Sequence, residues 1–437
     1  MGKKTLMSLA FEDNDQTPAL GELIESDEGL VAATDEDLMG AHDDSKQLDE
    51  LISTTEVLEG VQEAVQDAAE QGGFSPAAAK ALDVAIEHFE HTAGLTSIRR
   101  LSLESFAGGR TLRIQSTKVA LEEIGETIRR VIRRILEWIK HIASLCFDLI
   151  ERSVRGANAV AAKAELLYKV ASAMSHQRVN PSKLQQIEKS SLISFFNEHG
   201  KPLHAREIAA RYDSYSKDIN VMFGGDALFQ PPSKALRALD TYVQQHGEKA
   251  VDLSAVESFA AAACEELVHT SLRSFSPVHR DGADLLAKEL PFGNAQLLFS
   301  FAKGHNNPDK RVGFNVNIEV EEVSHTAALE PLSPQDVMNL MTVLHSHMGK
   351  GIYHDSKKIK AAIREIALHV EKQSEKLSDR QRQMGASIVP TLQLIRLITD
   401  SSMKLTRLAY SYSGVTGRRM LSYAEASLQA YHKARIA

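Results

Sequence analysis

The segment from about Thr111 to Ala173 constrains the fold most, because it contains no proline and carries a continuous helical pattern. Its apolar residues recur three or four positions apart, as they do on the buried face of an amphipathic helix. The clearest examples of this spacing are Ile124, Ile128, Ile132, Ile135, Ile139 and Ile142. We therefore expect one or two long helices here.

The composition favours the same fold class. Aromatic residues make up only 6% of the chain, and Trp138 is the only tryptophan, which points to helices packed through aliphatic side chains. The two cysteines, Cys146 and Cys264, lie in apolar helical runs and are too few for a disulfide framework. No run approaches the length of a membrane-spanning helix, and we expect neither a span nor a secretory signal.

One passage changes from helical to alternating periodicity. From Val312 to Val320 every second residue is apolar, which is typical of a strand with one buried face. The run from Ala295 to Phe301 alternates in the same way, and the intervening 304–309 is rich in turn residues. We expect a β-hairpin at 294–323.

The sequence thus predicts a mainly α fold, with a multi-helix body, one small antiparallel β-hairpin and a preceding acidic, partly disordered N-terminal segment. At the C-terminal end we expect separate helices at roughly 386–411 and 418–434, divided by Gly414 and Gly417. The predicted divisions are an acidic segment at 1–104 (1–52 largely disordered, 53–93 a helical hairpin, 94–104 a linker), long basic amphipathic helices at 105–175, a helical domain with the hairpin at 176–330, and C-terminal helices at 331–437.

The net charge of −8 conceals a strong division within the chain. Residues 1–104 hold 6 Lys and Arg against 23 Asp and Glu, a net charge of −17. The remainder holds 44 basic against 35 acidic residues, a net charge of +9. A body of this charge can lie beside a polyanion, whereas the attached acidic segment would neutralise it and repel phosphates.

Cations interleave with the apolar residues of the predicted long helix. Plain core packing with a solvated basic face is the ordinary interpretation, and contact with a membrane interface or with nucleic-acid phosphates are the two alternatives. The candidate contact residues are Arg129, Arg130, Arg133, Arg134 and Lys140.

No pattern in the sequence indicates catalysis, a cofactor or a metal site. His345 and His347 are two residues apart and therefore point to different sides of a helix. We find no nucleophile, base and orienting acid that sequence spacing would bring together. We therefore expect a chain that is not an enzyme; a site assembled only in space is the remaining alternative.

The junction between the acidic and basic parts contains the motif Ser102-Leu103-Glu104, followed by Ser105. Small and apolar residues in an unstructured joint can enter a protease cleft as an extended strand. A glutamate at the cut would supply a negative charge that a basic specificity pocket of the protease could recognise.

With this acidic segment, its glutamate motif and its helical body, the chain resembles the internal head, or inner body, proteins of giant phiKZ-like bacteriophages. In that family a prohead protease removes an acidic propeptide after Glu in a Ser/Ala/Gly-x-Glu motif. The resemblance implies a cut between Glu104 and Ser105. The same motif also ends at Glu28, Glu70, Glu87, Glu122 and Glu257.

Position favours Glu104, because it lies in the predicted linker and at the charge boundary, whereas most of the other matches fall in predicted helices. A further cut inside the propeptide, after Glu28, is an alternative.

The resemblance implies a structural protein of the virion interior that is made in the host cytoplasm and packaged with DNA, with ejection into the host as an open question. The implied partners are the phage prohead protease, other capsid and internal head proteins, and packaged DNA through non-specific electrostatics. The alternative function is a non-enzymatic, host-directed effector with an acidic solubilising tail.

Overall fold

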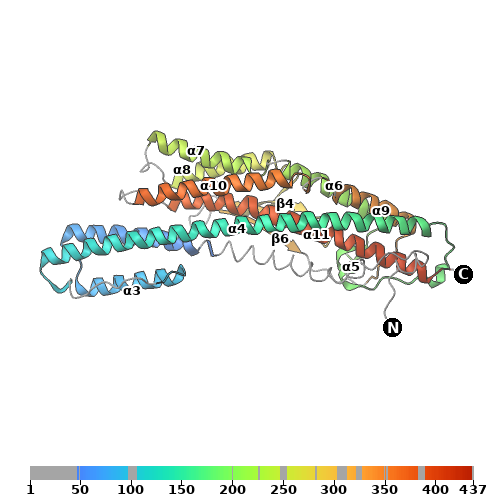
Figure 1. Ribbon diagram of the computed structural model, residues 1–437, viewed down its shortest axis with the longest axis horizontal. Coiled ribbons are helices and arrows are strands. Elements are labelled where there is room, and N and C mark those ends of the chain that lie inside the picture. The colour runs from blue at the N-terminus through green and yellow to red at the C-terminus, as the bar shows by residue number, and fades with distance from the viewer. Residues whose placement is uncertain are drawn as a thin grey trace.

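The structure is a computed structural model that describes residues 47–48, 50–96, 106–198, 200–224, 227–246, 253–280, 283–302, 313–320, 327–348, 350, 353–381 and 389–435. It is an elongated helical molecule, and helix α4 (Arg110–Met174) runs along most of its length (Figure 1). The mainly α fold with a small antiparallel sheet is confirmed. The described helices after α4 are α5 (Ser190–Phe196), α6 (Ala205–Phe223), α7 (Gln230–His246), α8 (Leu253–His269), α9 (Pro334–Met348), α10 (Ser356–Gln381) and α11 (Val389–Lys433).

Helix α4 is one uninterrupted helix of 65 residues. At 1.5 Å per residue it is about 100 Å long. The six isoleucines of the periodic pattern are all at most 5% exposed, so the predicted apolar face is the buried one. Helices α9, α10 and α11 all pack against α4, which makes it the central helix of the body.

Two further helices flank the N-terminal part of α4, shown in blue in Figure 1. One covers residues 50–71 and the other is α3 (Pro76–Thr92); together we call them the N-terminal helical pair. The Ser75 hydroxyl accepts a hydrogen bond from the Ala78 amide, and Pro76 occupies the first turn, as the sequence predicts for a helix start. The first helix includes Leu51 and Ile52, both buried, and therefore begins before Ser53, where the sequence pattern places its start.

The helix α3 runs parallel to α4. Near its start, the Phe74 amide donates a hydrogen bond of 2.9 Å to the hydroxyl of Thr117. Past its end, the carbonyl of Thr96 accepts one of 3.2 Å from Arg130, thirteen residues further along α4. Because the helices run in the same direction, the chain has to return along the bundle before α4 begins.

The sheet holds the predicted hairpin and two additional strands. Strands β5 (Ala295–Ala302) and β6 (Gly313–Val320) pair antiparallel, with Phe299 opposite Val316, so the expected hairpin is confirmed. Strands β3 (Ser276–Arg280) and β4 (Ala283–Glu289) extend it to a four-stranded sheet in the order β3-β4-β5-β6. A two-residue pair, β1 (Asn197–Glu198) with β2 (Lys201–Pro202), lies elsewhere.

Strands β3 and β4 were not predicted from the sequence because their composition is atypical of strands. Strand β3 contains a proline, which is tolerated at the sheet edge it occupies. Strand β4 reads ADLLAKE, a sequence of residues that favour helices, and its strand conformation comes from pairing with β5.

The prediction of two separate C-terminal helices is wrong: α11 is continuous from Val389 to Lys433. Gly414 and Gly417 lie inside it. A Cβ atom added at Gly417 would lie 2.7 Å from Met348 Cε, so this glycine permits a close approach of α9 to α11. Packing on both sides of α11 outweighs the roughly 1 kcal/mol that a glycine costs in a helix interior.

An aromatic cluster fills the centre of the body where α6, α11 and the sheet meet. The rings of Tyr215 and Tyr412 lie 5.3 Å apart, and the hydroxyl of Tyr412 donates a hydrogen bond of 3.0 Å to the Phe292 carbonyl. Burial raises the pKa of several phenols in this region, because an ionised phenolate is poorly solvated there. The affected residues are Tyr212, Tyr215, Tyr353, Tyr410, Tyr412 and Tyr423.

These buried tyrosines predict a loss of stability in alkali. In the unfolded chain a tyrosine ionises near pH 10, whereas the raised pKa keeps the folded phenol protonated. Their contribution is therefore fully present below about pH 10 and is lost as the pH rises towards the folded-state pKa, by roughly 1.4 kcal/mol per pH unit for each tyrosine. Urea unfolding at several alkaline pH values measures how steeply the free energy of unfolding falls with pH. Tyr212→Phe should reduce this slope by the contribution of one tyrosine, roughly 1.4 kcal/mol per pH unit. A free energy of unfolding that stays constant above pH 10 would contradict the prediction.

Candidate nucleic-acid interface on the long helix

The five predicted contact residues all lie on α4, but the structure separates them by exposure. The side chains of Arg133, Arg134 and Lys140 are 63%, 44% and 50% exposed. Those of Arg129 and Arg130 are only 22% and 15% exposed. Three of the five cations are thus open to a ligand, and two are partly covered by the protein itself.

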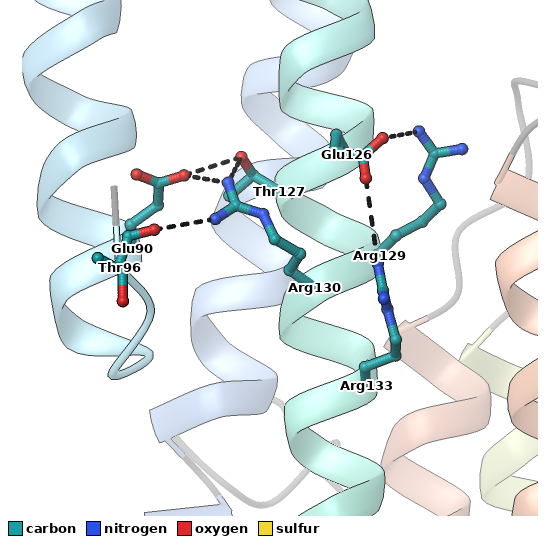
Figure 2. A network of polar contacts seen from close by, with 7 residues as sticks. All are labelled: Glu90, Thr96, Glu126, Thr127, Arg129, Arg130 and Arg133. Carbon is teal, nitrogen blue, oxygen red and sulfur yellow. Dashed lines mark hydrogen bonds and ion pairs between the residues drawn. The ribbon is translucent and has the colours of Figure 1, made fainter. Parts of the chain in front are cut away.

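The cover over Arg130 comes from the N-terminal helical pair. Glu90, near the end of α3, accepts a hydrogen bond from the Arg130 guanidinium and a longer one of 3.4 Å from the Thr127 hydroxyl (Figure 2). Arg130 also donates to the Thr127 hydroxyl at 3.0 Å, so the three side chains close a ring. The acidic segment therefore contacts the basic helix through a specific ion pair.

This ion pair is largely removed from water. The Glu90 side chain is 4% exposed. A buried carboxylate is stable only when it is both paired and hydrogen-bonded, and removing one partner of such a pair typically costs several kcal/mol. Arg130 pairs with Glu90, and Thr127 donates a hydrogen bond to it. Loss of this contact should therefore cost more free energy than loss of an ion pair on the surface.

Glu90 was not predicted from the sequence to be an interaction residue. The available signal was its spacing: Leu82, Ile86 and Glu90 follow one another at intervals of four, so all three share the buried face of α3. A glutamate on an apolar face indicates a cation opposite it, but the identity of that cation depends on how the helices pack.

The remaining cations of the stretch form ion pairs in which at least one partner is well exposed. On the other side of α4 in Figure 2, Arg129 and Arg133 lie near Glu126, at 2.8 Å and 4.0 Å. Arg134 pairs with Glu137 at 3.3 Å, and Lys140 reaches Glu371 on α10 at 2.5 Å. Exposed pairs of this kind contribute about 0–1 kcal/mol each, so phosphates can compete for these cations.

A cavity of about 1140 Å³ lies between the N-terminal helical pair and α4. Its lining includes the cations Lys118, Arg129 and Arg130. More carboxylates than cations line it, from both sides of the cavity: Glu70, Glu90, Glu122, Glu123 and Glu126. With the pair in place this part of α4 faces an acidic environment that disfavours phosphate.

The predicted cleavage residues Ser102, Leu103, Glu104 and Ser105 lie outside the described residues. On the C-terminal side the description resumes at Phe106, which is 1% exposed and belongs to the hydrophobic core. Of the other matches named above, four fall within helices, namely Glu70 (residues 50–71), Glu87 (α3), Glu122 (α4) and Glu257 (α8). A helical backbone is a poor protease substrate because proteases bind extended chains.

The histidines considered as metal ligands are separated in the structure. His347 Nε2 lies 2.9 Å from Asp213 Oδ1 on α6, where the pair links α9 to α6. Within the described residues no group of three or more His, Cys, Asp or Glu is arranged to hold a metal ion. Among the same residues, no helix combines the length and the apolar character that crossing a membrane requires.

Comparison with known proteins identifies a family for the chain. The model of the phiKZ-like phage internal head proteins matches residues 32–426, which is most of the chain. The match includes the N-terminal helical pair, all of α4 and most of α11. No match was found among the curated proteins or among the solved structures. The chain therefore belongs to the family of phiKZ-like phage internal head proteins.

Proposed function

We propose that this structural protein of the phage head interior is synthesised with residues 1–104 as an acidic propeptide, and that cleavage after Glu104 leaves a basic body suited to lie beside packaged DNA. Synthesis would take place in the host cytoplasm, and the cut would be made by the phage prohead protease. The role requires no catalysis by the chain itself.

The observation that carries the proposal is the contact between Glu90 and Arg130. It joins the acidic part of the chain, with a net charge of −17, to the basic part, with a net charge of +9. The acidic part therefore does more than keep the chain soluble, because it occupies a cation of the candidate phosphate-binding stretch.

The connection between the two parts joins points that lie far apart along α4. Thr96 contacts Arg130, whereas α4 begins at Arg110, so the intervening chain has to return past about 20 residues of helix. That distance is about 30 Å at 1.5 Å per residue. The proposed cut after Glu104 lies between these two fixed points of the chain.

Residues that follow the proposed cut would anchor the new N-terminus. Phe106, two residues after Glu104, is buried in the core, and Gly109 caps the start of α4. The mature chain would thus begin close to a fixed point of the body. Release of residues 1–104 would expose Arg130 beside Arg133 and Arg134, giving a denser group of guanidiniums for phosphate contact.

Mass spectrometry of purified virions tests the proposal. We expect peptides that begin at Ser105 and a protein mass that lacks residues 1–104. A matched digest of protein from cells without the phage protease should contain peptides that span Leu103 to Phe106. Recovery of those spanning peptides from virions in full yield, or absence of the protein from the particles, would contradict the proposal.

A further inference from the structure

The contact between the N-terminal helical pair and α4 resembles an interface between two proteins. The helix α3 packs on α4, and apolar residues are buried on both sides. On α3 they are Ala79, Leu82 and Ile86, and on the matching stretch of α4 they are Ala120, Leu121, Ile124 and Ile128. Separation would return these surfaces to water, which opposes it.

Polar contacts fix this interface at both ends. At one end the Phe74 amide donates to the Thr117 hydroxyl, and at the other Glu90 pairs with Arg130. Between the two ends lie about four turns of α4. Two directional contacts this far apart determine both the register and the direction of α3 on α4, which non-directional apolar packing alone would leave open.

The contacts at the two ends join α4 to residues 74–96, which precede residues 97–105 in the chain. A cut after Glu104 therefore removes the covalent connection but leaves these contacts in place. We infer that the N-terminal helical pair remains bound to α4 after the linker is cut, and that Glu90 sets how tightly it is held. The inference rests on the proposed cleavage and adds a second step to it: release of the pair, which exposes Arg130 and the apolar strip of α4.

Glu90 has this role because its carboxylate is buried, so it cannot exchange its pairing with Arg130 for contact with water. Its side chain is 4% exposed while the pair is docked, and its partner Arg130 is 15% exposed. Glutamine at this position keeps the size and one acceptor oxygen but loses the charge that matches Arg130. The guanidinium would then stay partly buried without a compensating anion.

The test uses the full chain with the recognition sequence of a site-specific protease inserted after Glu104. After the cut under native conditions, we expect the two fragments to co-elute in size-exclusion chromatography at micromolar concentration. A dilution series gives their dissociation constant, which we expect to lie below about 1 µM.

Two variants separate the role of Glu90 from a general charge effect. In the cut protein, Glu90→Gln is expected to raise the dissociation constant about 10- to 100-fold. Glu126→Gln is the matched control, since Glu126 also pairs with arginines of α4 but is 58% exposed, and it should change the constant less than about threefold. Before the cut, the tether holds the pair at high effective concentration, so uncut Glu90→Gln should elute like the wild type and keep its helical circular dichroism, which shows that it folds.

Immediate separation of the wild-type fragments would overturn the inference, and so would equal effects of the two substitutions. Because the inserted site makes the cut, these outcomes leave the proposed cleavage at Glu104 unaffected. Conversely, virions that contain only uncut protein would contradict the proposed function and leave the measured docking intact.

Discussion

A chain that begins at Ser105 is expected to bind duplex DNA about 10- to 100-fold more tightly than the full chain at low salt. The shortened chain has lost a net charge of −17 and retains +9. It has also lost Glu90, and with it the contact that occupies Arg130. Fluorescence anisotropy with a labelled duplex, measured on both chains, gives the ratio directly.

The salt dependence identifies the cations that take part. Each phosphate contact contributes about −0.9 to the slope of log affinity against log salt concentration. Arg133→Gln should reduce this slope by about one in both chains, because Arg133 is 63% exposed even with the N-terminal helical pair in place. Arg130→Gln should reduce it in the shortened chain, where Glu90 no longer occupies the guanidinium.

Binding should be independent of sequence, since the contacts are made to phosphates alone. Duplexes of different composition therefore serve as a control for the mode of binding. Size-exclusion chromatography of both chains checks whether uncovering the apolar strip of α4 changes the oligomeric state. Equal affinity of the two chains at every salt concentration would show that the charge division has no bearing on DNA.

Gly73→Ala is expected to lower the free energy of unfolding of the N-terminal helical pair by about 2–4 kcal/mol. Gly73 has a φ angle of +84°, a conformation that alanine adopts only with strain. In addition, a Cβ atom at this position would lie 2.5 Å from the carbonyl carbon of Arg113, so the pair would have to move away from the α4 backbone. Urea unfolding followed by circular dichroism measures the change.

Gly60→Ala is the matched control on the same pair. Gly60 lies in the helix over residues 50–71, and a Cβ atom added there meets nothing within 4 Å. Alanine should therefore stabilise that helix by about 0.5–1 kcal/mol, because glycine is a poor helix former. If both substitutions had the same sign, the close approach of Gly73 to α4 would not be important for stability.

Features that depend on neighbouring residues were predictable from the sequence. The long helix α4 follows from the absence of proline and from its isoleucine spacing. The start of α3 follows from Ser75 and Pro76, and the β5–β6 pair follows from alternation on either side of a turn-rich loop. In each case the interactions that form the element lie within a few residues along the chain.

Features that depend on distant partners were not predictable. Strand β4 has a helix-favouring sequence and becomes a strand because β5 lies beside it. Helix α11 passes through Gly414 and Gly417 because packing against α9 and other helices supports it on several sides. Local propensities amount to at most about 1 kcal/mol per residue, so tertiary contacts readily override them.

The candidate interface divides in the same way. The sequence by itself determined the opposite charges of the two parts and the five cations of the basic stretch, because charge is a property of the residues alone. Only the tertiary structure decided that Arg130 is occupied by Glu90 while Arg133 and Arg134 remain exposed. The physical reason is that the effect of a charge depends on its burial and its partner, and both are set by the packing of α3 against α4.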